Sequence, residues 1–205
     1  MAKLKSLSKF QILALALVAI GLVLVLVFGV RTYRSFRMLQ YIREQGIDTG
    51  TADVNAIQPW MTVRFVAVAY AVPQEYIFAA LDIPFDRRNS NDTLGALNRK
   101  FDLGRSPNGE YPAIIDSLAE AITQYRADPV ATGLEEDVRP WMSIQYISNS
   151  TGVPAEYIFE QLGIPDEDSN AFKPLDRLDK DYRFGGPREI SEAVQAALAR
   201  YEAKP

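Results

Sequence analysis

The chain has 205 residues, of which 48% are hydrophobic and 23% charged, so it can form one or two small domains with a buried core. It contains no cysteine and no histidine. These absences exclude disulfides, zinc–thiolate sites and thiol nucleophiles, and they remove the commonest general base and metal ligand. We therefore expect a protein that is not an enzyme and that binds no cofactor and no metal.

Charge is distributed unevenly along the chain, although the formal net charge is only −4. Residues 1–43 carry seven Lys and Arg and no acid. Residues 44–205 carry 15 basic and 26 acidic side chains, a net charge of −11. An acidic body of this kind is repelled by the phosphates of nucleic acid, so we expect no nucleic acid among its partners.

Residues Ile12 to Val30 form an uninterrupted run of 19 uncharged, apolar residues. As a helix the run is roughly 28 Å long, close to the ~30 Å of a bilayer's hydrocarbon core. A cleaved signal peptide is the alternative, but its apolar region is usually about 7–15 residues and precedes a small-residue cleavage site. The run therefore predicts a transmembrane helix over residues 11–30, after a basic tail over residues 1–10.

Basic residues flank the predicted span on both sides: Lys3, Lys5 and Lys9 before it, and Arg31, Arg34 and Arg37 after it. Such side chains meet lipid phosphates, and their excess marks the cytoplasmic side of a membrane. The numbers of basic residues on the two sides are nearly equal, but a short Lys-bearing tail ahead of the first span usually stays in the cytoplasm. We expect a single-pass protein of the cell membrane with an extracytoplasmic body, a juxtamembrane helix over residues 31–46 and a polar linker over residues 47–56.

An internal repeat occupies most of the remaining chain. The stretch PWMTVRFVAVAYAVPQEYIFAALDIP, residues 59–84, recurs as PWMSIQYISNSTGVPAEYIFEQLGIP, residues 140–165, with 12 of 26 positions identical. The correspondence continues to the end of the chain, with a five-residue deletion in the second copy. The repeat predicts two tandem duplicated units, residues 57–129 and 138–205, joined by a linker over residues 130–137. Stacked copies could bury apolar surface that neither hides alone.

Each unit is predicted to be a small bundle of about four helices, so we expect an all-α fold. Thr62 and Ser143 can cap the first helix of their unit through the side-chain hydroxyl. Pro73 and Pro154 suit the first position of the second helix, where a missing N–H costs nothing. Leu-Gly-Ile-Pro at residues 162–165 is a helix stop signal.

The first two predicted helices, as in MSIQYISNSTGVPAEYIFEQLGI (residues 142–164), resemble a helix-turn-helix and equally the two-helix core of the LysM module. The first resemblance implies DNA reading, but PAEYIFEQL carries two Glu and no cation to face DNA. The second implies binding of cell-envelope glycan. That family has a short strand on each side, which EEDVRPW and PDEDSNAFKP do not resemble.

An acidic cluster, PDEDSN at residues 165–170, spaces Asp166, Asp168 and Asn170 like the start of an EF-hand loop. The pattern then fails, because Ala171 stands where the loop needs glycine and Arg177 where it needs a bidentate Glu. We therefore predict an exposed loop without a calcium ion.

Four aromatic residues are candidates for contact with a partner. Trp60 and Trp141 occupy equivalent positions in the repeat, and either they anchor a partner or they close the base of each unit. Tyr76 and Tyr157 each precede Ile and Phe on a short helix. Three large apolar residues in a row cannot all face one core, so we expect these tyrosines to face the surface or the other unit.

These features favour a non-catalytic accessory or scaffold subunit of a bacterial membrane complex. Its partners would be the lipid bilayer and other membrane or extracytoplasmic proteins. Two alternatives remain from the resemblances. One is a module that binds envelope glycan, and the other is a membrane-anchored transcription regulator with its body in the cytoplasm.

Overall fold

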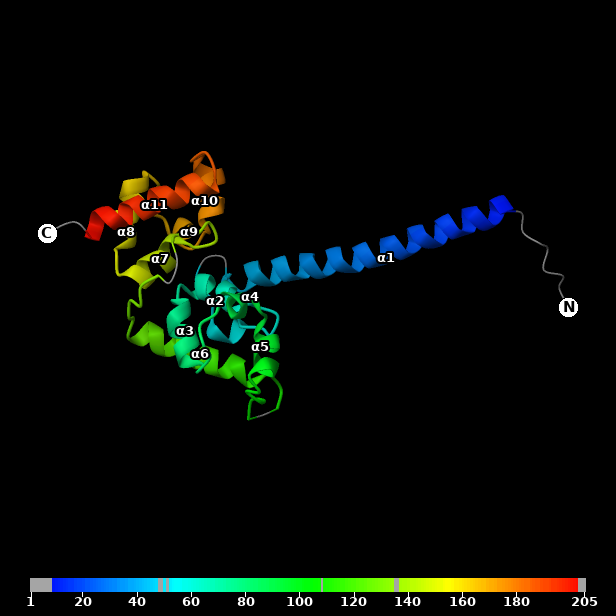
Figure 1. The fold of residues 1–205 in the computed structure, drawn as a ribbon, viewed down its shortest axis with the longest axis horizontal. Helices are drawn as coiled ribbons and strands as arrows, with labels where there is room; N and C mark the ends of the chain where they lie inside the picture. The colour runs from blue at the N-terminus through cyan, green and yellow to red at the C-terminus, as the bar shows by residue number, and fades with distance from the viewer. Residues whose placement is uncertain (1–8, 48–49, 51, 108, 135–136, 203–205) are drawn as a thin grey trace. The chain divides into compact units, whose positions relative to one another are not determined.

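The computed structural model describes residues 9–47, 50, 52–107, 109–134 and 137–202, with the backbone alone at residues 9–14, 16, 34 and 168. This part of the chain is mostly helical and contains no strand, only isolated β-bridges (Figure 1). The all-α prediction is thereby confirmed. The chain forms two compact units that divide between Glu44 and Gln45.

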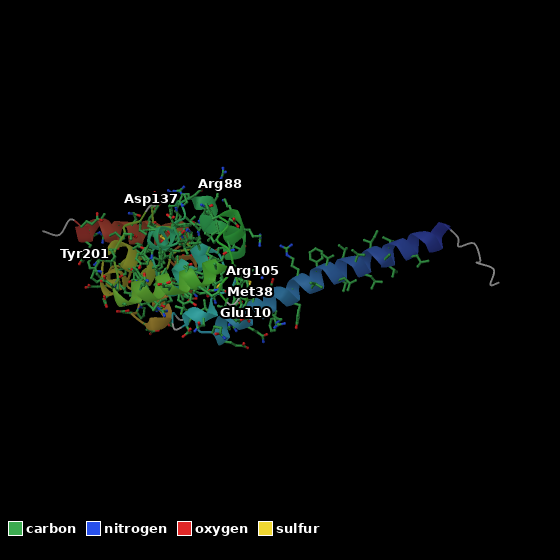
Figure 2. The ribbon with its side chains drawn as sticks, turned by 90° about the horizontal axis from the view of Figure 1, so that it is seen from below. Met38, Arg88, Arg105, Glu110, Asp137 and Tyr201 are labelled. Carbon is green, nitrogen blue, oxygen red and sulfur yellow. The ribbon has the colours of Figure 1, made fainter. Side chains whose placement is uncertain are left out.

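The first unit is a single unbroken helix, α1 (Lys9–Glu44), of 36 residues. Its apolar side chains project to all sides (Figure 2), and those of Leu24 and Val25 are 50% and 69% exposed. No stripe of the helix is therefore buried within the unit. By length and composition, α1 is the one helix among the described residues that could cross a membrane, with a mean hydropathy of 1.9 in its most apolar window.

The basic residues predicted to flank the span are only partly described. Arg31 and Arg37 are exposed on α1. Lys3 and Lys5 lie outside the described residues, and only the backbone is described at Lys9 and Arg34.

The second unit contains ten α-helices among its described residues, in two groups that follow the chain (Figure 1). The first group, which we call the first segment, consists of α2 (Val63–Tyr70), α3 (Gln74–Ala80), α4 (Arg87–Asn91), α5 (Leu94–Lys100) and α6 (Ala113–Ala127). The second group, the second segment, consists of α7 (Ile144–Thr151), α8 (Ala155–Leu162), α9 (Asp168–Ala171), α10 (Leu175–Tyr182) and α11 (Pro187–Glu202).

Each segment therefore has five helices where about four were predicted. The additional helices are α4 and α9, which have too few apolar residues to show a helical period. A buried asparagine holds each of them. Asn89 donates to the carbonyl oxygen of Pro84 at 3.1 Å, and Asn170 donates to that of Pro165 at 3.0 Å. Residues 165–167 of the acidic stretch are exposed and non-helical, as predicted, whereas residues 168–170 belong to α9 and Asn170 is 1% exposed, which differs from the predicted exposed loop.

Helix ends in this unit follow the predicted signals closely. The Thr62 and Ser143 hydroxyls accept hydrogen bonds from the third backbone N–H after them, at 3.1 and 3.2 Å, so both predicted caps are confirmed. Gly163 ends α8 with φ of 65°, as the stop signal predicts. Pro73 and Pro154 lie one residue earlier than expected, at the N-cap.

Each segment has its own apolar core. Leu94, Leu97, Ile114 and Leu118 of α5 and α6 are fully buried, as are Leu175, Leu178, Ile190 and Val194 of α10 and α11. Burial of such side chains contributes about 1.5–3 kcal/mol each. In each segment the fourth helix, α5 or α10, also bonds to the residues just before the first helix. The Leu94 N–H donates to the Met61 carbonyl and the Leu175 N–H to that of Met142, both at 2.8 Å.

Of the stretch 47–56, predicted to be a polar linker, residues 52–56 pack against the first segment. Ile47, Ala52 and Ala56 are buried. The short 3₁₀ helix η2 (Val54–Ala56) is capped by Asp53, whose backbone carbonyl accepts a hydrogen bond from the Tyr70 hydroxyl at 2.8 Å. The 3₁₀ helix η2 contacts α6, and the Arg126 guanidinium of α6 donates to the Ala52 carbonyl at 3.3 Å.

Candidate functional site

The two predicted tryptophans lie just before the first helix of their segments. Both are half-buried. The ring of Trp60 packs on Phe65 at a centroid distance of 5.9 Å, and that of Trp141 packs on Tyr146 at 5.6 Å. Each ring thus covers the start of its own segment's first helix, which is an arrangement that suits the structural role considered for these residues.

The two predicted tyrosines are also half-buried, and each packs on the last helix of its own segment. Tyr76 contacts Tyr125 edge-on at 5.0 Å, and Tyr157 contacts Tyr201 at 5.1 Å. Of the four candidate aromatic residues, Trp141 is the one that lines the pocket between the segments. The structure therefore does not gather the four into one site.

A contact between α2 and α7 joins the two segments. Asn149 of α7 donates from Nδ2 to the Ala71 carbonyl oxygen at 2.6 Å, and its Oδ1 accepts from Gln145 at 2.8 Å. The Tyr125 hydroxyl donates to the Asn149 carbonyl at 3.4 Å. Asn149 of the second segment thus bonds to two parts of the first segment, the turn after α2 and the helix α6.

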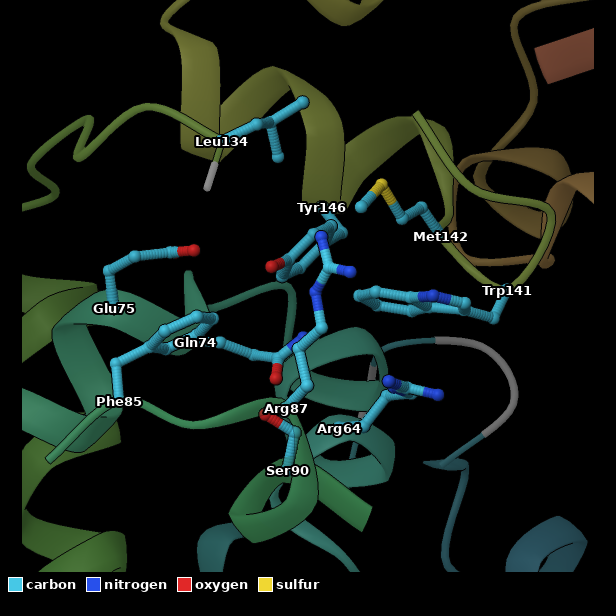
Figure 3. A pocket seen from close by; sticks show the side chains of 10 residues that line it. All are labelled: Arg64, Gln74, Glu75, Phe85, Arg87, Ser90, Leu134, Trp141, Met142 and Tyr146. Atoms are coloured by element: carbon cyan, nitrogen blue, oxygen red, sulfur yellow. The ribbon is translucent and has the colours of Figure 1, made fainter. Parts of the chain in front are cut away.

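A small pocket of about 10 Å³ lies beside this contact, with room for about one water molecule. Arg87 reaches from α4 toward Trp141 and Tyr146 of the second segment (Figure 3). The guanidinium of Arg64 lies 4.7 Å from the centre of the Trp141 ring, a cation–π contact across the interface. The pocket is also lined by Gln74, Glu75, Phe85, Ser90, Leu134 and Met142.

Polar groups are buried at the centre of the interface. Gln74 is 4% exposed and Ser150 is fully buried, and both side chains lie within hydrogen-bonding reach of the Tyr146 hydroxyl. Burial raises the pKa of the Tyr146 hydroxyl above its usual value of 10, and the negative charge of Glu75 raises it further. The phenol is therefore neutral at pH 7, whereas Arg64, Glu75 and Arg87 contribute the charges at this interface.

The described residues hold no group of three or more Asp or Glu that could bind a metal ion. The titratable groups at the pocket are Arg64, Glu75, Arg87 and Tyr146. Arginine and a tyrosine whose pKa is raised are poor general bases at pH 7. The arrangement joins two helical segments through polar and aromatic contacts.

Comparison with known proteins gives the chain no family. No protein family, curated protein or solved structure that we compared with it matches. The resemblances to helix-turn-helix and LysM hairpins thus rest on the residues of α2–α3 and α7–α8 alone.

The sequence reasoning missed the interface residues Gln74, Asn149 and Ser150. A signal was present in the repeat. The equivalent positions, 81 residues away, are Ala155, Val68 and Ala69, so one copy is polar where the other is apolar. Such a difference indicates a position whose surroundings differ between the copies.

Proposed function

We propose that this protein is a non-catalytic, single-pass membrane protein whose helical body is a scaffold for other membrane or extracytoplasmic proteins. The observation that carries the proposal is α1, a 36-residue helix that forms a unit of its own and exposes apolar side chains on all sides. In water this exposed area would be strongly unfavourable, whereas in a bilayer it meets acyl chains.

The body, in this proposal, consists of two duplicated units, residues 57–129 and 138–205. Hydrogen bonds that recur 81 residues apart support the duplication. The Gly95 N–H donates to the Pro59 carbonyl and the Asp176 N–H to that of Pro140, both at 2.9 Å. The Leu94 and Leu175 bonds described above form a second matched pair. Two related units give a scaffold two similar surfaces for partners.

The acidic surface of the body supports protein partners over nucleic acid. Residues 44–205 carry a net charge of −11, which disfavours DNA binding and the anchored-regulator alternative. We place the body outside the cytoplasm because the short lysine-bearing tail ahead of α1 favours the inside. The glycan-binding alternative stays open, since half-buried aromatic side chains such as Tyr157 could stack on sugar rings.

A topology experiment tests the anchor and the side of the membrane. The chain has no cysteine, so single cysteines report without background. Ala80→Cys is on an exposed position of α3, and Ser6→Cys precedes the apolar run. In intact cells a membrane-impermeant maleimide should label Ala80→Cys and should label Ser6→Cys only after permeabilisation. The reverse pattern would place the body in the cytoplasm and favour the regulator.

A purification experiment tests the scaffold role. The full chain with a C-terminal tag is extracted from membranes in mild detergent, and co-purifying proteins are quantified. We expect a defined set of membrane proteins in stoichiometric amount. The untagged full chain, treated in the same way, serves as the control and should bring down none of these proteins. A protein that purifies without partners and binds isolated envelope glycan would exclude the scaffold role and favour the glycan-binding alternative.

A further inference from the structure

The contact between the two segments uses a different face from each. The first segment contributes what we call its receiving face, which consists of Ala71, Pro73 and Gln74 at the turn into α3. The second segment contributes its inserting face, which consists of Tyr146, Asn149 and Ser150 on α7. Because the two faces differ, the contact is heterologous and each segment keeps one face unused.

The unused receiving face lies on the second segment. Ala71 and Gln74 are 2% and 4% exposed, and Pro73 is buried. Their equivalents 81 residues later are Gly152, Pro154 and Ala155. Gly152 and Pro154 are exposed, and Ala155 is half-buried. The same backbone surface that α7 covers in the first segment is thus exposed at the start of α8, with only Ala131 of the connecting chain beside Gly152 among the described residues.

The unused inserting face lies on the first segment. Tyr146 is 1% exposed, whereas its equivalent Phe65 is only half-buried. Val68, the equivalent of Asn149, is half-buried as well. The ring of Trp60 packs beside Phe65 and continues this apolar surface along α2.

The two unused faces match each other in chemistry. In the internal contact, the polar Tyr146 and Ser150 lie near the polar Gln74. At the equivalent positions, half-buried Phe65 on the inserting face would meet half-buried Ala155 on the receiving face, and Ala69, the equivalent of Ser150, is already 7% exposed within its own chain. All three positions change from polar to apolar together. The Asn149–Ala71 hydrogen bond is likewise replaced by Val68 opposite Gly152, which removes a side-chain donor without burying one unpaired.

We propose that these faces bind each other between chains, so that the second segment of one copy receives α2 of a second copy in head-to-tail order. The inference rests on the proposed duplication, because it carries the internal contact over to the equivalent residues. Phe65 and Val68 of one copy lie on Gly152, Pro154 and Ala155 of its neighbour. Each contact of this kind uses one face of each chain and leaves the other face of that chain free. Further copies can therefore bind in a row or close into a ring.

Two general effects act on this association. Each body carries a net charge of −11, so copies repel each other and association should strengthen as salt screens the charges. Anchoring in one membrane favours association, since it raises the effective concentration of the neighbouring copy. Head-to-tail contacts should therefore be more frequent in membranes than in dilute detergent.

Cysteine cross-linking in the full chain tests the proposal. The double variant Phe65→Cys/Ala155→Cys, expressed in membranes and treated with an oxidant, should give a ladder of dimers, trimers and larger species. Co-expressed Phe65→Cys and Ala155→Cys single variants should give dimers only. A matched control, Ala80→Cys/Ala199→Cys, puts cysteines on exposed positions outside both faces and should remain monomeric.

Two results would overturn the proposal. A Phe65→Cys single variant that dimerises with itself as well as with Ala155→Cys would show a two-fold contact instead of a head-to-tail one. A double variant that remains monomeric across the salt range, while tryptophan fluorescence shows a folded body, would show that the faces do not meet.

A further variant separates contact from chance collision in the membrane. Val68→Asp, added to the cysteine pair, places a charge in the apolar contact at a half-exposed position that tolerates it. The ladder should fall by on the order of tenfold, and an undiminished ladder contradicts the proposal. Failure of the anchor would instead leave the protein in the soluble fraction, and failure of the scaffold role would leave the ladder without other proteins.

Discussion

The first and second segments share their capping and cross-helix hydrogen bonds but differ in what covers the turn into their second helix. In the first segment, α7 covers Ala71 and Gln74. In the second segment, Gly152 is open to solvent. This difference shows that the caps and hydrogen bonds within a helical hairpin determine its internal packing. The residues on its surface determine which face binds a neighbouring segment.

Replacing the equivalent leucines in the two cores should give the largest change in stability and shows whether the two segments depend on each other. Leu94→Ala and Leu175→Ala each remove a fully buried side chain and should lower the free energy of unfolding by about 2–5 kcal/mol. Urea titration followed by tryptophan fluorescence measures the change. If the segments unfold as one body, both variants shift a single transition.

Tryptophan variants provide the control for that experiment, because each segment has one tryptophan. With Trp60→Phe, the remaining Trp141 reports on the second segment and on its contact with Arg64, whereas Trp141→Phe leaves Trp60 to report on the first segment. Coincident midpoints are expected. Separate midpoints would show that the contact between α2 and α7 does not couple the segments.

The interface itself is tested by exchanging equivalent residues. Asn149→Val gives α7 the residue found in α2 and leaves the Ala71 carbonyl without its 2.6 Å hydrogen bond. We expect a loss of about 1–3 kcal/mol in the free energy of unfolding. The reciprocal Val68→Asn lies on the open face and should cost less than about 0.5 kcal/mol. Equal effects of the two changes would contradict the asymmetry of the contact.

Left-handed backbone positions provide a finer comparison. Asp82 lies two residues after the end of α3 with φ of 53°, and its equivalent Gly163 directly follows α8 with φ of 65°. Gly163→Ala introduces a Cβ where left-handed backbone disfavours one, so it should destabilise the body by about 1 kcal/mol. Asp82→Gly should be neutral or stabilising by a few tenths, since Asp tolerates this conformation. Thermal unfolding would measure both, and a stabilised Gly163→Ala variant would contradict the backbone assignment.

The smallest expected effect is a pH dependence at Tyr146. Its pKa in the folded state is raised above the unfolded value of 10, so its contribution to stability is complete below pH 10 and is lost as pH rises further. At pH 10.5 the loss should be under about 1 kcal/mol. Tyr146→Phe, which copies Phe65, should flatten the decline of unfolding free energy between pH 10 and 11. Exposed Tyr111→Phe is the control and should leave the decline unchanged.

The sequence predicted the helical class, the caps at Thr62 and Ser143 and the stop at Gly163, because these depend on local backbone chemistry. It did not predict α4 and α9, which depend on the buried Asn89 and Asn170 and have no apolar period. The repeat contained that information, since the two asparagines are 81 residues apart.

The interface could not be read from one copy for a related reason. Gln74 and Ser150 look like surface residues on short helices, and their burial depends on a neighbour distant in sequence. Tyr76 and Tyr157, in contrast, looked like contact residues because three large side chains stand in a row. Their rings pack within their own segments, since Tyr125 and Tyr201 offer an aromatic partner there.

The unbroken course of α1 also sets a length scale. If residues 12–30 lie in the hydrocarbon of a bilayer, the 14 residues from Arg31 to Glu44 continue as helix for about 21 Å beyond it. A rod of this length acts as a spacer between the acyl chains and residue 45. A short flexible tether would have no fixed length, whereas a helical spacer sets the distance along its axis between the acyl chains and residue 45. On this assumption the helix fixes the distance along its own axis from the hydrocarbon to Glu44.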